Sequence, residues 1–149
     1  MHRSRQLVLS LLLATSIREK PKPNVLTLDA TAPAPTGPLV VYVTARGFSI
    51  HGPSGNVGPG CEGVATGVTI PARDGGAHDF DELRRCAIKL KATVPGLATQ
   101  TKIEIGADKS TPYATVIATM DAVRSSGPTG DDLFPDVSFN VGPPNPQPN

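Results

Sequence analysis

The stretch from Ala107 to Arg124 (ADKSTPYATVIATMDAVR) gathers side chains that could carry out acid–base chemistry, namely Asp108, Tyr113 and Asp121. The two carboxylates also have structural explanations. Asp108 follows a predicted strand and precedes a predicted helix, where a carboxylate interacts favourably with the helix N-terminus. Asp121 lies one residue from the apolar stripe of that helix. We therefore predict that this stretch is scaffold and that it holds no catalytic pair.

Histidine offers little more for catalysis or metal binding. The three histidines include no pair with metal-ligand spacing. His78, Glu82 and Cys86 could be combined into a site, and a Cys–His nucleophile pair needs a third group to orient it. No such group stands out, and Asp79 with Glu82 fits a helix-capping pattern instead. The residues predict no catalytic centre, no metal site and no cofactor.

A glycine-rich loop at Gly58–Gly63 (GPGCEG) matches the spacing G-x-G-x-x-G of dinucleotide-binding proteins. That pattern needs a preceding strand and a helix that opens within it. Here it contains Pro59, and a predicted strand follows it in place of a helix. We therefore interpret it as a loop.

The two cysteines, Cys61 and Cys86, leave two alternatives open. In an extracytoplasmic domain they could form one disulfide, which would stabilise the fold by about 3–4 kcal/mol in the chain-entropy model. Otherwise they are two reduced thiols that are partly buried and unrelated.

Composition argues against a nucleic-acid partner. The formal net charge is +1, four Phe and two Tyr are the only aromatic residues, and Trp is absent. Nucleic-acid surfaces require clustered basic charge, and single-strand binders add stacking aromatics. Proline and glycine concentrate toward the ends and in one internal loop, so we expect the folded domain to span residues 39–142, with a disordered tail at 143–149.

The N-terminus is predicted to be a leader or an anchor. Residues 1–6 are basic, and Leu7–Ile17 (LVLSLLLATSI) is apolar and uncharged. A helix over the apolar part would span about 16 Å, roughly half of a bilayer's hydrocarbon core. Residues 1–17 therefore resemble a short signal peptide, or the end of a membrane helix that begins upstream; a short tail on a cytosolic protein is the alternative.

A proline-rich linker follows at residues 18–38. Within it, the four residues Val25, Leu26, Thr27 and Leu28 have strand character. A short strand inside a linker usually pairs with another segment, and we expect it to contact a partner chain, such as the second copy of a dimer.

The domain itself alternates strand and helix patterns. The pattern of residues 39–51 predicts a β-hairpin, and that of residues 67–71 predicts a short edge strand. Residues 79–95 are predicted to form a helix capped by Asp79, and residues 102–107 to form a half-buried strand. A second helix is expected to start with Thr111 as N-cap and Pro112 as first helical residue. Its apolar stripe comprises Tyr113, Val116, Ile117, Met120 and Val123.

A last strand is predicted around Val137 and Phe139. This order predicts an α+β fold, a small mixed β-sheet with two helices packed on one face. The basic residues of the first helix, Arg84, Arg85, Lys89 and Lys91, are predicted to form a solvated face.

Several of these segments, taken in order, resemble the ExbD/TolR family. Ile105–Arg124 is similar to the family signature, in which a strand ends in an Ala-Asp-Lys turn and leads to a Pro/Tyr helix start and a Val-x-x-x-Met-Asp helix. Asp108, Pro112, Tyr113, Met120 and Asp121 are the matching residues. The hairpin, the first helix, the closing strand at Leu133–Phe139 and the extended segment Val25–Leu28 also occur in the family's order.

The resemblance implies a function in the bacterial envelope. ExbD/TolR proteins are non-enzymatic subunits of inner-membrane complexes that use the proton motive force to energise transport of biopolymers. Their partners are a polytopic ExbB/TolQ-like protein and a TonB/TolA-like protein, and the periplasmic domain forms a homodimer that can contact peptidoglycan. We expect this chain to lie in the inner membrane with a periplasmic domain, or in the periplasm if its leader is cleaved.

One feature departs from the family. Its members carry an essential Asp in a full transmembrane helix, whereas Met1–Ile17 contains no acidic residue. No residue here can be assigned the proton-coupling role. The alternative is a stand-alone periplasmic module that binds peptidoglycan or a protein partner, and an in-frame apolar helix with one Asp upstream of Met1 would favour the transport subunit.

Overall fold

The computed structural model describes residues 36–140. The predictions for the leader, for Val25–Leu28 and most of the linker, and for the tail at 143–149 lie outside these residues. Among the helices of the described part, none combines the length and the apolar character needed to cross a membrane.

The strands and helices follow the predicted order, with one further short strand. In chain order they are β1 (Leu39–Thr44), β2 (Gly47–Gly52), β3 (Gly55–Asn56), β4 (Ile70–Pro71), α1 (Phe80–Thr93), β5 (Lys102–Ala107), α2 (Tyr113–Arg124) and β6 (Asp136–Asn140). Two single-turn 3-10 helices, η1 (Pro59–Cys61) and η2 (Asp74–Gly76), lie in the connections.

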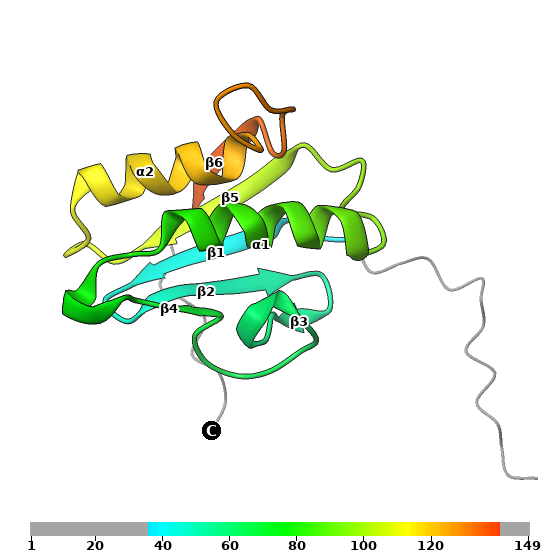
Figure 1. The fold of residues 1–149 in the computed structure, drawn as a ribbon. Coiled ribbons are helices and arrows are strands. Elements are labelled where there is room, and N and C mark those ends of the chain that lie inside the picture. The colour runs from blue at the N-terminus through cyan, green and yellow to red at the C-terminus, as the bar shows by residue number, and fades with distance from the viewer. Residues whose placement is uncertain (1–35, 141–149) are drawn as a thin grey trace, which may run out of the picture. The chain divides into compact units, whose positions relative to one another are not determined.

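The six strands form one mixed sheet in the order β3-β2-β1-β5-β6, with β4 also paired to β2. β1 and β2 are antiparallel, whereas β1, β5 and β6 run parallel. Each parallel pair is joined through a helix, as parallel strands require. Both helices cover the same face of the sheet (Figure 1), so the predicted α+β class with two helices on one face is confirmed.

Alternation of side chains divides the sheet into a buried and an open face. Val41 on β1 lies opposite Ile50 on β2 and Ile105 on β5, and all three are buried under the helices. On the open face, Tyr42 lies beside Gly106, where a Cβ atom would overlap the tyrosine ring. Only glycine fits beneath that ring without displacing it.

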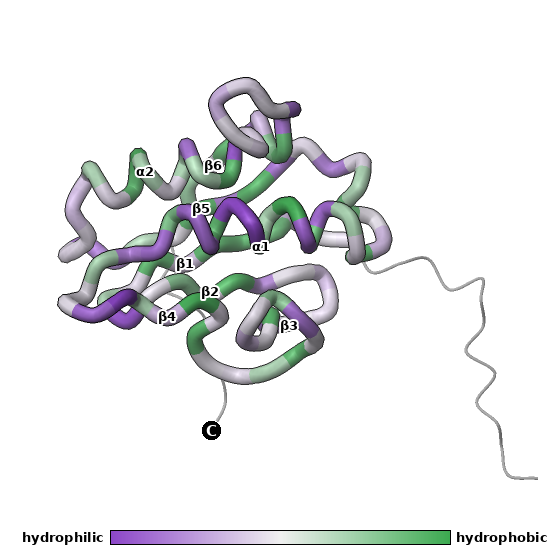
Figure 2. The backbone as a smooth tube through the Cα atoms, in the orientation of Figure 1, coloured by the Kyte–Doolittle hydropathy of each residue, from purple (hydrophilic) through white to green (hydrophobic). Residues whose placement is uncertain are grey.

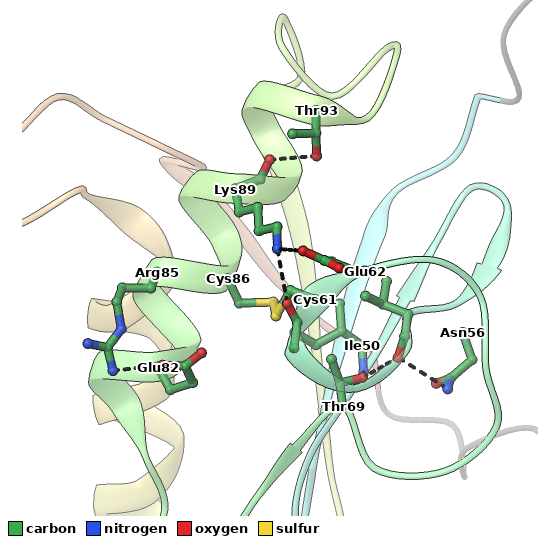
Figure 3. The surroundings of a disulfide bond; sticks show 12 residues. Ile50, Asn56, Cys61, Glu62, Thr69, Glu82, Arg85, Cys86, Lys89 and Thr93 are labelled. Atoms are coloured by element: carbon green, nitrogen blue, oxygen red, sulfur yellow. Dashed lines mark hydrogen bonds and ion pairs between the residues drawn. A yellow bond between two sulfur atoms is a disulfide. The ribbon is translucent and has the colours of Figure 1, made fainter.

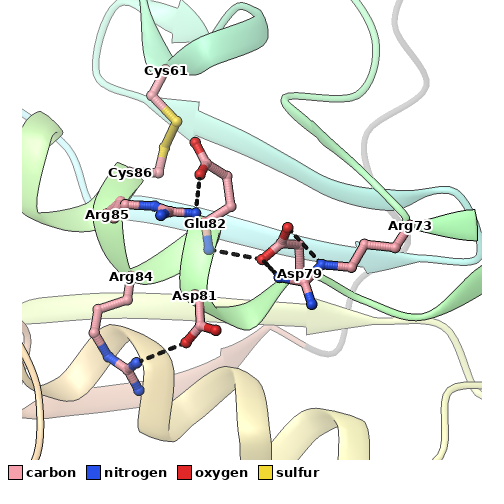
Figure 4. A network of polar contacts seen from close by, with 8 residues as sticks. All are labelled: Cys61, Arg73, Asp79, Asp81, Glu82, Arg84, Arg85 and Cys86. Atoms are coloured by element: carbon pink, nitrogen blue, oxygen red, sulfur yellow. Dashed lines mark hydrogen bonds and ion pairs between the residues drawn. A yellow bond between two sulfur atoms is a disulfide. The ribbon is translucent and has the colours of Figure 1, made fainter.

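α1 begins after its predicted cap, Asp79, and ends at Thr93, just before Pro95-Gly96, but the predicted capping box is only half formed. The Asp79 carboxylate accepts a hydrogen bond of 3.0 Å from the backbone N–H of Glu82, which satisfies one of the free donors of the first turn. The Glu82 carboxylate does not reach back to complete a capping box and instead pairs with Arg85 at 2.7 Å (Figure 4). Its buried stripe is Leu83, Cys86, Ala87 and Leu90. Polar and apolar residues alternate along the helix in Figure 2.

The predictions for the start of α2 were wrong in two respects. Pro112, with ψ of 139°, is the N-cap and Tyr113 the first helical residue, because Thr111 belongs to a turn that its N–H closes onto the Asp108 carbonyl at 2.9 Å. Tyr113 was expected in the core but is 78% exposed. The helix packs through its C-terminal half, where Ala122 and Val123 are fully buried, so its first turn lies away from the core.

Candidate functional site

The signature residues are not brought together as an active site. Asp108 is exposed in the turn after β5, where its carboxylate accepts a hydrogen bond from Ser110. Asp121 is exposed on α2 and lines a polar hollow with Arg84 and Arg124. Met120 is partly buried against the core. The described residues contain no group of three His, Cys, Asp or Glu side chains that could hold a metal ion.

His78 makes structural contacts and is not combined with Glu82 and Cys86 into a catalytic site. Its Nε2 atom lies 2.8 Å from the Thr44 carbonyl oxygen, and its ring packs 5.1 Å from the ring of Phe48. The residue thus ties the segment before α1 to the end of β1. Glu82 is turned toward Arg85, so the two do not form a site.

The segment just before α1 is also fixed by an ion pair. Arg73 donates two hydrogen bonds to Asp79, at 2.6 and 2.8 Å (Figure 4). These bonds, followed by the one from the backbone N–H of Glu82, lower the pKa of Asp79. The carboxylate is therefore held in its charged form at the helix N-terminus.

Cys61 and Cys86 are joined by a disulfide in the structure, with Cα atoms 5.6 Å apart. Both residues are buried, and the bond ties η1 to the middle of α1 (Figure 3). Cys61 has φ of +61°, the left-handed region that non-glycine residues seldom occupy, and is alone among non-glycine residues of the described part in doing so. The disulfide holds this residue in place against the helix.

The loop that carries Cys61, residues 53–69, is ordered by buried polar contacts. We refer to it as the disulfide loop. The Thr69 hydroxyl accepts from the Ile50 N–H at 3.0 Å and donates to the Val57 carbonyl at 2.7 Å. The Asn56 amide donates to the carbonyl of Ala65. The bond to the Ile50 N–H pairs a buried donor, and together these bonds shape the loop into a fixed wall.

An apolar pocket lies between this wall and the C-terminal half of α1. Its volume is about 490 Å³, and it is open on one side. The buried residues that line it are Leu39, Val57, Cys61, Leu90 and Leu97. Val64 stands at its rim with 67% of its surface exposed, which makes it one of few large apolar side chains exposed in the described residues. We call this site the apolar pocket.

The mouth of the apolar pocket carries one ion pair. Lys89 on α1 pairs with the Glu62 carboxylate and donates a hydrogen bond of 3.2 Å to the Gly60 carbonyl oxygen (Figure 3). The hydrogen bond and charge of Lys89 lower the pKa of Glu62, which favours the charged carboxylate. The rim therefore has both signs of charge and no net excess.

The prediction that the basic residues of α1 form a solvated face was wrong for Lys91. Its Nζ donates to the carbonyl oxygens of Gln100 and Leu133, at 2.6 Å each, and lies 4.5 Å from the centre of the Phe134 ring. Burial lowers the pKa of this ammonium. Lys91 connects α1 to the segments that lead into β5 and β6, a role that its position off the apolar stripe does not reveal.

The apolar pocket was not predicted from the sequence. Its lining residues come from β1, from the end of β2, from the disulfide loop, and from α1 with the turn that follows it, and they share no motif. Two features of the sequence pointed toward this region, the glycine-rich loop Gly52–Gly63 and the cysteine within it. They indicated an ordered loop only if the disulfide formed.

Comparison of the chain with protein-family models, with curated proteins and with solved structures finds no match. The resemblance to the ExbD/TolR family therefore stays a prediction that depends on the residues quoted for it.

Proposed function

We propose that this chain is a non-enzymatic accessory subunit of a proton-motive-force-driven inner-membrane complex of the ExbB–ExbD or TolQ–TolR type, which energises transport of biopolymers across the envelope. The observation that carries the proposal is the position of Ile105–Arg124. This segment, which resembles the family signature, forms the end of β5, the following turn and α2 of an α+β domain, the kind of fold that the resemblance implies.

The location of the domain in the periplasm is part of the proposal. A buried disulfide between Cys61 and Cys86 is consistent with an oxidising compartment, because cytosolic thiols are kept reduced. The proposed partners are an ExbB/TolQ-like polytopic protein, a TonB/TolA-like protein and a second copy of the chain. Val25–Leu28 is the proposed strand for contact with that copy.

The apolar pocket favours a protein partner over the polar glycan of peptidoglycan. The buried residues of its lining are hydrocarbon and sulfur, whereas its hydroxyl groups, Ser54 and Thr93, are on exposed residues, so a sugar hydroxyl placed against the buried lining would lose its water without gaining a hydrogen bond. This observation ranks the protein-binding module above the peptidoglycan-binding one as the alternative to the transport subunit.

The test is co-purification from the native membrane. The full chain with a C-terminal affinity tag is expressed at its natural level, the membranes are solubilised in mild detergent, and the captured proteins are identified by mass spectrometry. We expect a polytopic membrane protein in stoichiometric amount. A tagged chain that is recovered only from the soluble periplasmic fraction, with no polytopic protein, would contradict the proposal and favour the stand-alone module.

A further inference from the structure

We propose that the outer edge of β6 pairs with the same edge of a second copy of the chain, in the antiparallel direction, so that the sheet continues from one copy into the other. The inference deepens the proposed function and rests on it for the presence of two copies in one complex. The surface and its geometry follow from the position and the residues of β6.

β6 is an open edge of the sheet. It lies beside β5 at one end of the strand order, and within the described residues it has a strand neighbour on that side only. The Asp136 N–H donates to the Thr101 carbonyl at 3.1 Å, so the backbone of Asp136 is turned toward β5. Because backbone groups alternate in direction along a strand, the N–H and C=O groups of Val137 and Phe139 point away from β5. They bond to no described residue, and a further strand would use them.

The two ends of the sheet differ in how they are protected against pairing. Proteins block the edges of their sheets with very short strands, with proline or lysine, or with bulges. At the end opposite β6, β3 is only two residues long and β4 contains Pro71. β6 has five residues, with neither proline nor lysine, and it pairs with β5 in an unbroken register. Its outer edge is therefore the one that is able to accept a further strand.

An apolar side chain lies exposed beside this edge. Phe139 is the register partner of Ile105, so its ring lies on the face that the helices cover, yet the residue is 53% exposed. Val137, which lies on the same face, is only partly buried against the core. A strand added at the edge would cover both side chains and remove their apolar surface from water, which favours the contact.

The residues of β6 are complementary to themselves in the antiparallel direction. One register pairs the whole of Asp136–Asn140 with its copy, and it places the Ser138 residues of the two copies opposite each other. Val137 then lies opposite Phe139, and because both have outward backbone groups, each such pair exchanges both of its N–H···O bonds. An aromatic ring opposite a β-branched side chain is a favourable cross-strand pair. Asp136 lies opposite Asn140, so no two like charges meet.

This self-complementarity selects a second copy as the occupant. A contact about a two-fold axis uses the same surface on both copies, so one pairing closes both open edges. A strand from another protein would close the edge of one copy only. Pairing of two five-residue strands buries less than a standard interface of about 1,200–2,000 Å². We therefore expect a weak contact that is favoured when one complex holds both copies and raises their effective concentration.

The test is disulfide crosslinking of the full chain through one introduced cysteine, because a covalent bond traps a weak contact. Cys61 and Cys86 are bonded to each other, so the introduced thiol is the free one. Opposite residues of an antiparallel pair that do not bond to each other have Cα atoms about 4.5 Å apart, and a disulfide spans about 4.4–6.8 Å. Ser138→Cys should therefore crosslink to its copy under mild oxidation, and non-reducing electrophoresis shows the covalent dimer.

Asp136→Cys is the matched control. Asp136 is exposed on the same strand and the same face as Ser138, but in the proposed register its copy lies about four residues along the second strand, about 14 Å away. This variant should crosslink only when it is mixed with Asn140→Cys, which would face it. We expect Ser138→Cys to form the dimer at least about tenfold faster than Asp136→Cys alone, because the control thiols cannot reach bonding distance.

Substitutions at Phe139, made together with Ser138→Cys, separate the side chain from the backbone. Phe139→Ser should slow crosslinking severalfold, because it removes the apolar ring. Phe139→Pro should abolish it, because proline also removes an outward N–H while β6 keeps its bonds to β5. Val64→Ser replaces another exposed apolar residue, in the disulfide loop, and should leave the rate unchanged. Melting curves show whether each variant retains the fold.

Two results would overturn the inference. Equal rates for Ser138→Cys and Asp136→Cys would show that the thiols meet by random collision and that β6 does not pair in this register. Crosslinking that persists in Phe139→Pro but is lost when Leu26 and Leu28 are both replaced by serine would assign the contact between copies to Val25–Leu28. If Phe139→Pro is unstable, the comparison of the two cysteine positions, which leaves Phe139 unchanged, decides.

The two proposals fail separately. If a polytopic protein co-purifies but Ser138→Cys crosslinks no faster than its control, the β6 contact falls and the proposed function stands. If β6 crosslinks as expected but no polytopic protein is recovered, the chain pairs through β6 as a stand-alone module and the transport function falls.

Discussion

Removal of the disulfide is the perturbation whose effect can best be estimated from the structure. The double variant Cys61→Ala, Cys86→Ala breaks the bond, and the reduced wild-type protein, refolded in a reducing buffer, breaks it without changing a residue. Both cysteines are buried, at 4% and 2% exposure, so the reducing agent must be added to the unfolded protein.

The magnitude follows from the size of the closed loop. The two cysteines are 25 residues apart, and the chain-entropy relation gives about 3.5 kcal/mol at 25 °C for a loop of this size. Domains typically unfold with about 5–15 kcal/mol, so the loss is a large part of the total. For a domain of roughly 100 residues, it corresponds to a decrease in Tm of about 15 °C or more. The alanine variant should lose slightly more, because two buried sulfur atoms are also removed.

The assay is urea unfolding followed by far-ultraviolet circular dichroism, on the oxidised protein, the reduced protein and the alanine variant. We expect the reduced protein to have a lower unfolding free energy and a larger m-value, because the unfolded chain without the crosslink exposes more surface. Mass spectrometry under non-reducing conditions verifies the bond in the starting material.

A decrease of less than 1 kcal/mol with an unchanged m-value would refute this reasoning. It would mean that the hydrogen bonds of Thr69 and Asn56 hold the disulfide loop closed even in the unfolded ensemble, or that the bond is not present in the native protein. Free thiols at both positions in protein isolated from its native compartment would decide for the second explanation.

Three further substitutions test the framework around the sheet. Thr69→Val should cost about 1–3 kcal/mol, because it leaves the buried Ile50 N–H unpaired and removes one of the two donors to the Val57 carbonyl, while Thr69→Ser stays within about 1 kcal/mol in the same urea titration. Gly106→Ala should cost about 1–3 kcal/mol through overlap with the Tyr42 ring, and adding Tyr42→Ala should recover part of that loss. If the double variant instead loses the sum of the two single losses in unfolding free energy, the overlap is contradicted. Asp79→Ala should cost about 1 kcal/mol and Asp79→Asn less, because asparagine keeps the cap acceptor and loses only the pair with Arg73. The pKa of Asp79 is lower in the folded than in the unfolded protein. Its contribution to the free energy of unfolding is therefore complete above the unfolded pKa of about 3.9 and disappears as the pH falls through the lower folded value. A difference in unfolding free energy between wild type and Asp79→Ala that stays constant from pH 7 to pH 2 would contradict this.

The elements that could be predicted are those whose signals lie close together in the chain. The hairpin of β1 and β2 follows from two apolar runs separated by Arg46-Gly47, and α1 follows from Asp79 at its start and Pro95-Gly96 after its end. The α+β class follows from the order of these elements. Each depends on propensities and hydrogen bonds that a residue makes with neighbours a few positions away.

The candidate site could not be predicted in the same way. The lining of the apolar pocket combines Leu39 from β1, Val57 from the disulfide loop and Leu90 from α1, and their proximity depends on the pairing of β1 with β2 and on the packing of α1. Lys91 was expected in solvent because its helical position is off the apolar stripe. It is partly buried because two later segments, at Gln100 and Leu133, place carbonyl oxygens within reach of its ammonium.

The sequence by itself determined where the chain turns, where α1 is capped and which side of β1, β2 and β5 is apolar, because these are properties of short windows. Only the tertiary structure decided which strands are neighbours, that Tyr113 at the start of α2 remains exposed, and that the disulfide loop and α1 enclose an apolar pocket. These features depend on contacts between residues far apart in the chain, and such contacts exist only when the sheet, the helices and the loop are packed together.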